Sequence, residues 1–234
     1  MSNNVVKFLE KFTPCDVSDA LVKFGHPTGG FIPNLKRFSK NAQGSSAVGK
    51  AYTVLYAPKS DPRPEVKDKY IDILPKDSIV VIALSKELQS AHAPYVKLNN
   101  AVYGGLMSTR AQYLGAKGSV IFARIRDVDE HRDLGYPVFA YGLGTAAPGP
   151  VVKVVGINVP VEVTVGEGQY ETINPEDILI ADENGVVKVP KDEQLIEKIT
   201  EYIPKRVEAD QLVAEDIKRG EEAAKAQKLR RANL

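Results

Sequence analysis

The sequence predicts a single α/β domain, spanning residues 1–234, with helices attached at both ends of its core. In the first half of the core, apolar runs typical of buried strands alternate with helical patterns, and in the second half β-branched residues form a series of short strands. This order is typical of mixed α/β layers. We therefore expect N-terminal helices over residues 1–24, the α/β core over 25–190 and a C-terminal helical extension over 191–234.

Two helices are expected before the core. The segment from Asn3 to Phe12 carries apolar side chains at helical spacing. Thr13, followed by Pro14 and then by Asp16 three positions after the cap, is typical of a helix start. Asp16 therefore has a structural explanation. Asp19 lies beyond the first turn, where the helix dipole favours an acid less, and it remains a candidate site residue.

The remaining elements follow from local composition. Strand-like runs occupy residues 47–56, 79–84, 119–123, 151–165, 170–173, 178–181 and 186–189. Residues 25–44, rich in Gly, Pro and Asn, are expected to form a loop with brief extended pieces. A helix is expected from Pro64 to Asp72. The C-terminal tail has an apolar stripe of helical period, with breaks expected at Pro204 and Gly220.

A glycine pair stands at the centre of the chain. Apolar side chains recur at helical spacing from Val102 to Tyr113, and Gly104 and Gly105 interrupt the start of this pattern. The pair either allows close helix packing or lies in the turn that opens the helix at about Leu106. In the second case the free N–H groups would face an anion, aided by the helix dipole.

Charged residues follow the strand over residues 119–123. Acidic and basic residues crowd the positions after Ala123, at the carboxyl end of a strand, where α/β proteins place their sites. Arg126 can hold a carboxylate through its planar guanidinium, and Asp127 can ligate a hard divalent cation through oxygen. The competing interpretation is a solvated polar loop that ends the strand. If the glycines open the helix, the helix and the Arg-Asp pair would converge on one small anionic ligand.

Four segments together resemble the RraA-like proteins, which include the 4-hydroxy-4-methyl-2-oxoglutarate aldolases. They read CDVSDAL from Cys15, GGLMSTRAQYL from Gly104, IRDVDE from Ile125 and DILIADENGVVKVP from Asp177. The resemblance covers nearly the whole chain. It implies a swivelling α/β/β sandwich with flanking helices, related to the phosphohistidine-carrying domains of phosphotransfer enzymes.

The resemblance also implies a function. Such proteins are class II type aldolases that cleave 4-hydroxy-4-methyl-2-oxoglutarate or 4-carboxy-4-hydroxy-2-oxoadipate to pyruvate and a second 2-oxoacid, and that decarboxylate oxaloacetate. They use a divalent metal cation, Mg²⁺ or Mn²⁺, and their sites lie between the subunits of a homotrimer or a dimer of trimers. The alternative within the same family is a protein-binding regulator that masks a ribonuclease without chemistry.

The resemblance assigns roles to individual residues. It places Arg126 and Asp127 as the catalytic pair, with Arg126 over the substrate and Asp127 as the direct metal ligand. It places the pyruvoyl end of the substrate against the backbone of four residues, Gly104, Gly105, Leu106 and Met107. Cleavage and decarboxylation both leave a pyruvate enolate, whose negative oxygen requires a cation and a Lewis acid nearby.

This sequence departs from the pattern of the family at one position that would support the metal. The bacterial aldolases have an acidic residue just after the signature glycine, and this chain has none there. A carboxylate elsewhere must then support the metal. The candidates are Asp19, Asp16 and a carboxylate of another subunit. Glu201 and Glu208 are candidates for the carboxylate from another subunit. The general acid or base is not identified, and His131 is an outside candidate.

Composition limits the other classes of function. The 234 residues carry a formal net charge of +1, which argues against a broad nucleic-acid footprint. One cysteine, Cys15, excludes an internal disulfide and fits a reducing compartment. The N-terminal residues lack the apolar core of a secretory signal, and no apolar run is long enough to span a bilayer. We expect a cytoplasmic protein, and the resemblance implies that its partner is a small 2-oxoacid substrate.

Overall fold

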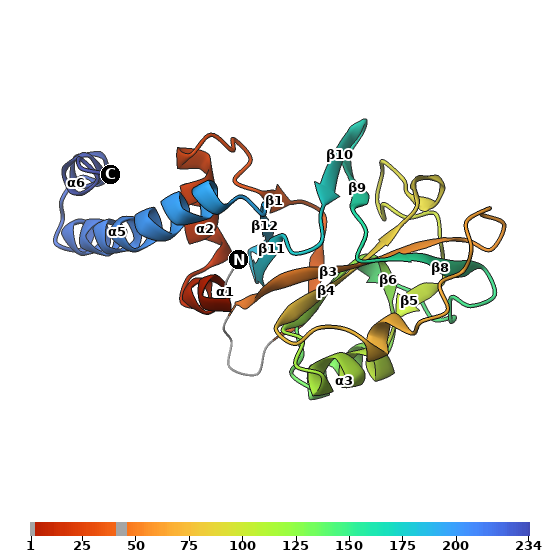
Figure 1. Cartoon of the computed structure of the whole chain (residues 1–234). Helices are drawn as coiled ribbons and strands as arrows, with labels where there is room; N and C mark the ends of the chain where they lie inside the picture. The colour runs from red at the N-terminus through yellow and green to blue at the C-terminus, as the bar shows by residue number, and fades with distance from the viewer. Residues whose placement is uncertain (1–2, 41–45) are drawn as a thin grey trace.

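The computed structural model describes residues 3–40 and 46–234, so part of the predicted 25–44 loop lies outside the described residues. Its strands are β1 (Phe31–Ile32), β2 (Lys36–Ser39), β3 (Ala47–Pro58), β4 (Ser78–Leu84), β5 (Ala101–Tyr103), β6 (Gly118–Ile125), β7 (Val138–Leu143), β8 (Val152–Ile157), β9 (Val161–Gly166), β10 (Gln169–Ile173), β11 (Ile178–Asp182) and β12 (Gly185–Val189). All but β9 and β10 join one mixed sheet in the order β1-β12-β11-β3-β4-β6-β7-β2, with β5 on β6 and β8 on β3. The predicted α/β class is confirmed (Figure 1).

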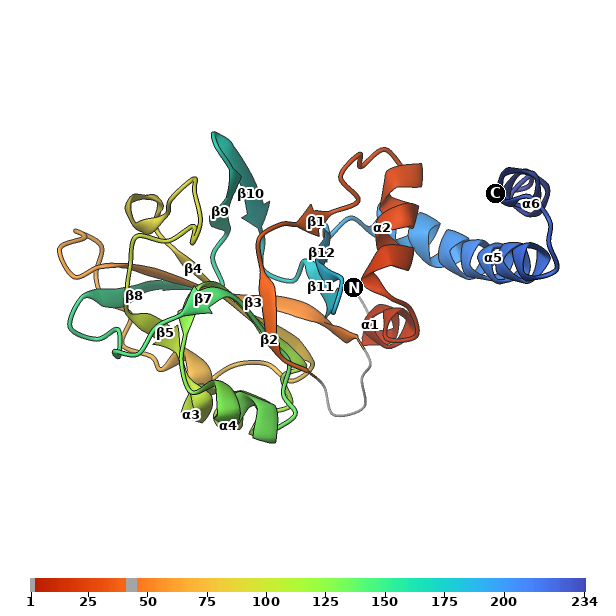
Figure 2. The ribbon, with the colours of Figure 1, turned by 180° about the vertical axis from the view of Figure 1, so that it is seen from behind.

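The centre of the sheet is parallel and buried. β3, β4, β6 and β7 pair in parallel, and every residue of β4 is buried, as its unbroken apolar run predicts. Two helices, α3 (Gly105–Tyr113) and α4 (Val128–Asp133), lie beside each other against one face of this sheet (Figure 2). The carboxyl end of β6 therefore meets the amino end of α3.

A second core holds the terminal helices. α1 (Asn3–Leu9), α2 (Pro14–Lys23) and α5 (Glu193–Lys218) pack together against β11 and β12, and α6 (Ala223–Arg230) follows α5 (Figure 1). The predicted start of α2 is confirmed, because the Asp16 N–H donates to Thr13 Oγ1 (3.2 Å) and the Thr13 N–H donates to Asp16 Oδ2 (2.8 Å). In the part of the chain that the structure describes, no helix is long and apolar enough to cross a membrane.

Two predictions about helices are wrong. The helix expected from Pro64 to Asp72 is reduced to a 3-10 turn, η1 (Tyr70–Asp72), because the Val66 N–H donates to the Val154 oxygen (2.9 Å) and holds the segment along β8. The break expected at Pro204 is absent, since α5 runs through it. A proline inside a helix costs about 3 kcal/mol, and burial of neighbouring apolar side chains in the second core offsets that cost.

Candidate active site

The glycine pair opens a helix. Gly104 is the N-cap of α3 and Gly105 its first residue, which confirms the second of the two interpretations of the pair. The Gly105 N–H donates to Asp127 Oδ2 (3.1 Å), and the Met107 N–H donates to the Gly104 oxygen (3.0 Å). The amino end of α3 therefore already faces a negative charge, supplied by a side chain from the end of β6.

The buried face of α3 is made of small residues. Leu106 and Tyr113, which belong to the apolar pattern of this segment, are 75% and 79% exposed. Ser108 and Ala111 are buried instead, because small side chains let the helix lie close to the sheet. The Ser108 hydroxyl lies 3.3 Å from the buried Tyr103 hydroxyl.

Asp127 is held in an unusual backbone conformation. Its φ of 61° and ψ of 46° lie in the left-handed region, which non-glycine residues seldom adopt. The predicted polar loop is wrong at this point, because α4 begins at the next residue with Asp127 as its N-cap. The Asp127 side chain does not cap α4, and its carboxylate turns towards α3 while staying 33% exposed.

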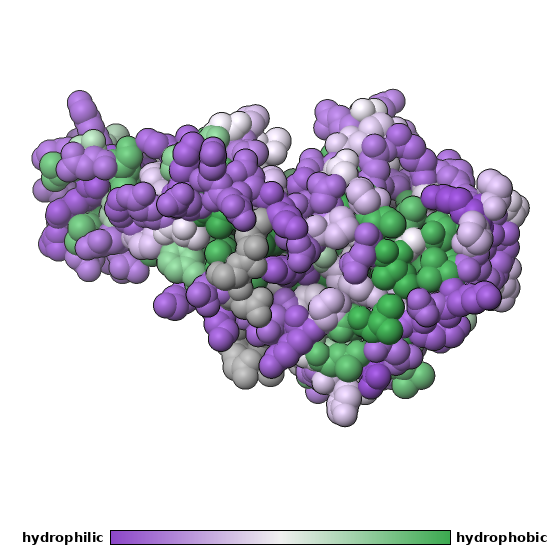
Figure 3. Space-filling model, in the orientation of Figure 1, coloured by the Kyte–Doolittle hydropathy of each residue, from purple (hydrophilic) through white to green (hydrophobic). Residues whose placement is uncertain are grey.

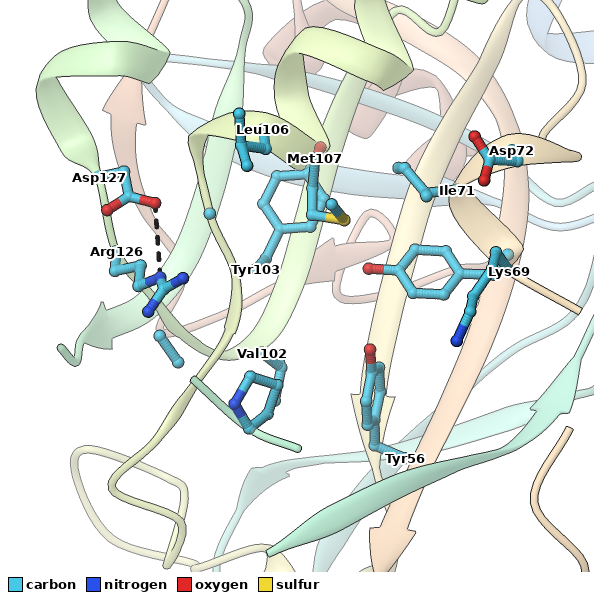
Figure 4. Close-up of a pocket in the computed structure, with 14 residues that line it drawn as sticks. Tyr56, Lys69, Ile71, Asp72, Val102, Tyr103, Leu106, Met107, Arg126 and Asp127 are labelled. Atoms are coloured by element: carbon cyan, nitrogen blue, oxygen red, sulfur yellow. Dashed lines mark ion pairs between the residues drawn. The ribbon is translucent and has the colours of Figure 1, made fainter. Parts of the chain in front are cut away.

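Arg126 lies beside this carboxylate. Its Nε is 3.5 Å from Asp127 Oδ2 (Figure 4). Its Nη1 donates to the Thr145 oxygen (3.3 Å) in the loop after β7. The side chain is 40% exposed, and among the described residues its Nη2 makes no hydrogen bond. The guanidinium is thus fixed on one edge and free to receive an anion on another.

Glu130 joins the site, although sequence reasoning gave it no role. A Cβ atom built on Gly105 would lie 1.8 Å from Glu130 Oε2, so the Glu130 carboxylate covers the space that a side chain at position 105 would fill. A Cβ atom on Gly104 would lie 2.6 Å from Asp127 Oδ2. The three-residue spacing of the two acids on a helix start was the available signal, because it puts them on one face.

Gly104, Arg126 and Asp127 border a cavity of about 420 Å³. Its wall is largely apolar and aromatic, with Val102 and Met107 on the side of Arg126 and with Tyr56 opposite (Figure 4). Tyr70, whose ring forms an edge contact with that of Tyr56, also lines the cavity. Burial raises the pKa of the Tyr56 and Tyr70 hydroxyls, so both stay protonated at neutral pH. The cavity offers an anion site at one end and hydroxyl dipoles on the far wall.

The other predicted acids lie elsewhere in the chain. Asp16 caps α2, and Asp19 pairs with Arg206 of α5 (3.1 Å). Glu201 and Glu208 are exposed on α5. All four belong to α2 or α5, which lie away from α3 and α4 (Figure 2). Within one chain, none of them contributes to the cavity.

His131 does not reach the cavity. It is fully buried in α4, and its ring stacks on Tyr103 with centroids 5.9 Å apart and an interplanar angle of 20°. Neither ring nitrogen has a hydrogen-bond partner among residues 3–40 and 46–234. His131 therefore supports the packing beneath the site and is not placed to exchange a proton with a ligand.

Burial lowers the pKa of His131, against the opposing effects of the Arg126 backbone and of the Asp127 and Glu130 carboxylates. Below about pH 6.5 the unfolded chain takes up a proton that the folded chain refuses, so folding stability falls as the pH drops towards the lowered value. His131→Phe keeps the ring stack and removes this loss. The Tm of the variant minus the Tm of wild type is measured at about pH 5.5 and at about pH 7.5. We expect this difference to be larger at the lower pH, by about 2 °C or more. An equal difference at both pH values would contradict this account.

Comparison with known proteins shows the family of this chain. The family model RraA-like, described as Aldolase/RraA, matches residues 14–188. The chain belongs to the RraA-like family. The predicted resemblance is confirmed, and so is the α/β fold expected for an RraA-like protein.

Individual relatives of this RraA-like chain vary in length. DlpA of Legionella pneumophila is 30% identical over 191 residues, which is 81% of this chain but 28% of DlpA. A Halalkalibacterium halodurans protein provisionally named 4-hydroxy-4-methyl-2-oxoglutarate aldolase is 29% identical over 199 residues, 83% of this chain and 81% of that protein. The crystal structure of an uncharacterized protein from Pseudomonas syringae pv. tomato matches with a TM-score of 0.77 at 25% identity, over 97% of this chain and 98% of its own.

The donor set at the cavity fits magnesium or manganese better than zinc. Among the described residues there is no group of three or more His, Cys, Asp or Glu side chains that could hold a metal ion, as a structural zinc site would require. Mg²⁺ is often held by one or two carboxylates, with waters and substrate oxygens completing its shell. Asp127 provides one partly exposed carboxylate, and Glu130 lies over the adjacent glycine.

Proposed function

We propose that this protein is a divalent-metal-dependent carbon–carbon lyase that releases pyruvate from 2-oxoacids. It would cleave 4-hydroxy-2-oxoacids in the manner of the 4-hydroxy-4-methyl-2-oxoglutarate and 4-carboxy-4-hydroxy-2-oxoadipate aldolases, and it would decarboxylate oxaloacetate. The observation that carries the proposal is the meeting of Arg126 and Asp127 with the amino end of α3 at the mouth of one cavity. A solvated turn would not hold Asp127 in a left-handed backbone conformation with its carboxylate against another helix.

Arg126 acts on the substrate in this proposal. Its fixed guanidinium would bind the carboxylate and carbonyl oxygens of the pyruvoyl half and stabilise the negative charge that develops there as the carbon–carbon bond breaks. The Gly105 and Met107 amides, which resemblance assigns to the substrate, already donate to Asp127 and Gly104. Recognition of the anionic substrate by the helix end would therefore act mainly through its dipole and through a cation held by Asp127.

Asp127 would hold the divalent cation, and Glu130 would support it from the adjacent turn. When bound, the ion supplies a Lewis acid for the substrate's oxygens. The contact with the Gly105 N–H fixes Asp127 Oδ2, which leaves Oδ1 for a ligand. No lysine is required for a Schiff base in this scheme.

We expect pyruvate release from oxaloacetate to require added magnesium or manganese. Treatment with EDTA followed by its removal should lower the rate at least about tenfold, and adding back either ion should restore it. The rate is measured by coupling pyruvate to lactate dehydrogenase, and the rate in the same metal without protein is subtracted. A protein-dependent rate that survives chelation unchanged would contradict the metal requirement.

We further propose a homotrimer or a dimer of trimers, in which a carboxylate of the neighbouring subunit completes the metal's surroundings. Glu201 and Glu208 are exposed on α5 and free of the cavity of their own chain, as a donor to another chain must be. Light scattering should give a mass three or six times that of the chain. A monomer would contradict this proposal. The alternative function, a ribonuclease-masking regulator, predicts no pyruvate release with any metal.

A further inference from the structure

The cavity has a second positive group besides Arg126. Its charged lining residues are Lys69, Asp72, Arg126 and Asp127. Lys69 lies on the wall that faces Arg126 across the cavity (Figure 4). The proposed lyase chemistry employs Arg126 and Asp127 and gives Lys69 no role.

The Lys69 ammonium is available to a ligand. Its side chain is exposed, and within the described part of the chain the ammonium makes no hydrogen bond or ion pair. Asp72 does not neutralise it, because Asp72 Oδ1 accepts a hydrogen bond from the Arg110 Nε (2.8 Å). Asp68, the adjacent acid in the chain, is exposed and does not line the cavity.

The backbone that carries Lys69 is held in place. The next residue, Tyr70, is buried, and its backbone oxygen accepts a hydrogen bond from the Tyr52 hydroxyl (3.0 Å). The pair of Arg110 and Asp72 joins η1 to α3, the helix whose amino end meets Arg126. The start of the Lys69 side chain therefore has a fixed position relative to α3, and only the flexible stem has to turn towards a ligand.

The lining between Lys69 and Arg126 is apolar and aromatic. Val102 and Ile71 are almost fully buried there, and Met107 extends the surface along the first turn of α3. Figure 3 shows hydrophobic residues gathered on this face, over β5 and β8 and beside α3. A charged group of a ligand would lose water in this middle region without gaining a hydrogen bond. The charged groups of a ligand are therefore best placed at the two ends.

A 4-hydroxy-2-oxoacid would have its orientation set by the reaction. Arg126 takes the carboxylate of the pyruvoyl half, so the group on C4 extends into the rest of the cavity. A carboxylate on C4 would gain a charge-assisted hydrogen bond from the Lys69 ammonium. An alkyl group in its place would leave that ammonium without a partner.

We propose that Lys69 determines the substrate specificity of this enzyme by binding a second carboxylate carried on C4. This inference rests on the proposed lyase function. In the reaction the C3–C4 bond breaks, the C4 hydroxyl loses its proton and becomes a carbonyl, and the bonding pair moves to C3 as pyruvate enolate. The enolate takes up one proton to give pyruvate, and the second carboxylate stays on the other product.

Two ligands that cannot be cleaved test the binding step. 2-Oxoglutarate carries the second carboxylate, whereas 2-oxopentanoate has a methyl group in its place. Calorimetry with magnesium present gives the Kd of each for wild type and for Lys69→Met. We expect Lys69→Met to weaken 2-oxoglutarate by about tenfold and 2-oxopentanoate by less than about twofold. Equal changes for the two ligands, or no change for either, would overturn the inference.

Lys67→Met is the matched control. Lys67 is exposed two residues before Lys69 and does not line the cavity, so the loss of the same charge should change either Kd by less than about twofold. Lys69→Arg keeps a cation at the site and should keep the preference for 2-oxoglutarate. If Lys67→Met weakens 2-oxoglutarate as much as Lys69→Met does, the effect is general attraction and the role of Lys69 is wrong.

Cleavage separates this role from the lyase function. 4-Hydroxy-2-oxoglutarate and 4-hydroxy-2-oxopentanoate differ in the same way and would yield glyoxylate and acetaldehyde beside pyruvate. Lys69→Met should raise KM for the first by about tenfold with little change in kcat, because the second carboxylate keeps its charge throughout the reaction. It should leave both constants for the second unchanged.

The two levels of the proposal fail in different ways. Pyruvate from both substrates, with Lys69→Met equal to wild type, would overturn the role of Lys69 and leave the lyase function standing. No pyruvate from either substrate or from oxaloacetate, together with loss of 2-oxoglutarate binding in Lys69→Met, would overturn the lyase function and support Lys69 as the group that binds the second carboxylate.

Discussion

Replacing Arg126 with lysine is expected to lower kcat/KM for pyruvate release by about 100-fold or more, even though the charge is kept. Lysine is a point charge on a flexible stem and does not reproduce a planar guanidinium held by Asp127 and the Thr145 oxygen. Loss of one oriented donor to a developing negative charge costs about 10² to 10³ in rate. The measurement is steady-state pyruvate formation from oxaloacetate with magnesium.

Arg132→Lys is the matched control for this substitution. Arg132 lies on α4, two turns from Arg126 along the chain, and donates to the Phe38 oxygen and to Asp129 outside the cavity. Its replacement should change kcat/KM less than about twofold. Equal losses in both variants would mean that Arg126 acts through general electrostatics or folding, and the substrate-binding role would be wrong.

Replacing Gly105 with alanine is expected to damage both stability and activity. The new Cβ would meet Glu130 at three atoms, Oε2 at 1.8 Å, Cδ at 2.6 Å and Cβ at 2.7 Å. Rotation of the carboxylate relieves the first contact but not the last, so α4 must move away from α3 and carry Asp127 with it. Overpacking of this kind costs about 1–3 kcal/mol, and the rate should fall at least about tenfold. Thermal unfolding and pyruvate formation measure the two effects.

Two further variants locate the cause. Gly105→Ala combined with Glu130→Ala removes the contacts with Oε2 and Cδ and leaves the one with Cβ, so the double variant should regain part of the lost Tm while remaining weak in activity. Gly149→Ala, where nothing lies within 4 Å of the added Cβ, should leave both quantities unchanged. If Glu130→Ala fails to rescue the Tm of the Gly105 variant, the contact between α3 and α4 is not the reason that glycine stands at this position.

The sequence predicts the buried parts of the fold well. The run that became β4 and the cap of α2 are determined by residues next to each other in the chain, so local reasoning suffices. The segment after Pro64 and the helix through Pro204 are determined by distant partners, β8 in one case and the second core in the other. Local composition carries no information about those partners.

The candidate site shows the same division. Gly105, Arg126 and Asp127 are predictable because their residue types and spacing are specific. The position of Glu130 over Gly105 is not, because it depends on α4 forming where a polar loop is expected and on its approach to α3. The exposure of Leu106 could not be predicted either, since an apolar residue at helical spacing normally faces the core.

The central claim is that Asp127 makes the cavity a metal-dependent lyase site. Pyruvate release from oxaloacetate, with magnesium present, is compared between wild type, Asp127→Ala and Asp129→Ala, the last removing the same charge from a side chain that is 92% exposed two residues away. The account predicts that wild type and Asp129→Ala exceed the rate of free metal and that Asp127→Ala falls to it. Activity of Asp127→Ala equal to that of wild type would contradict the claim.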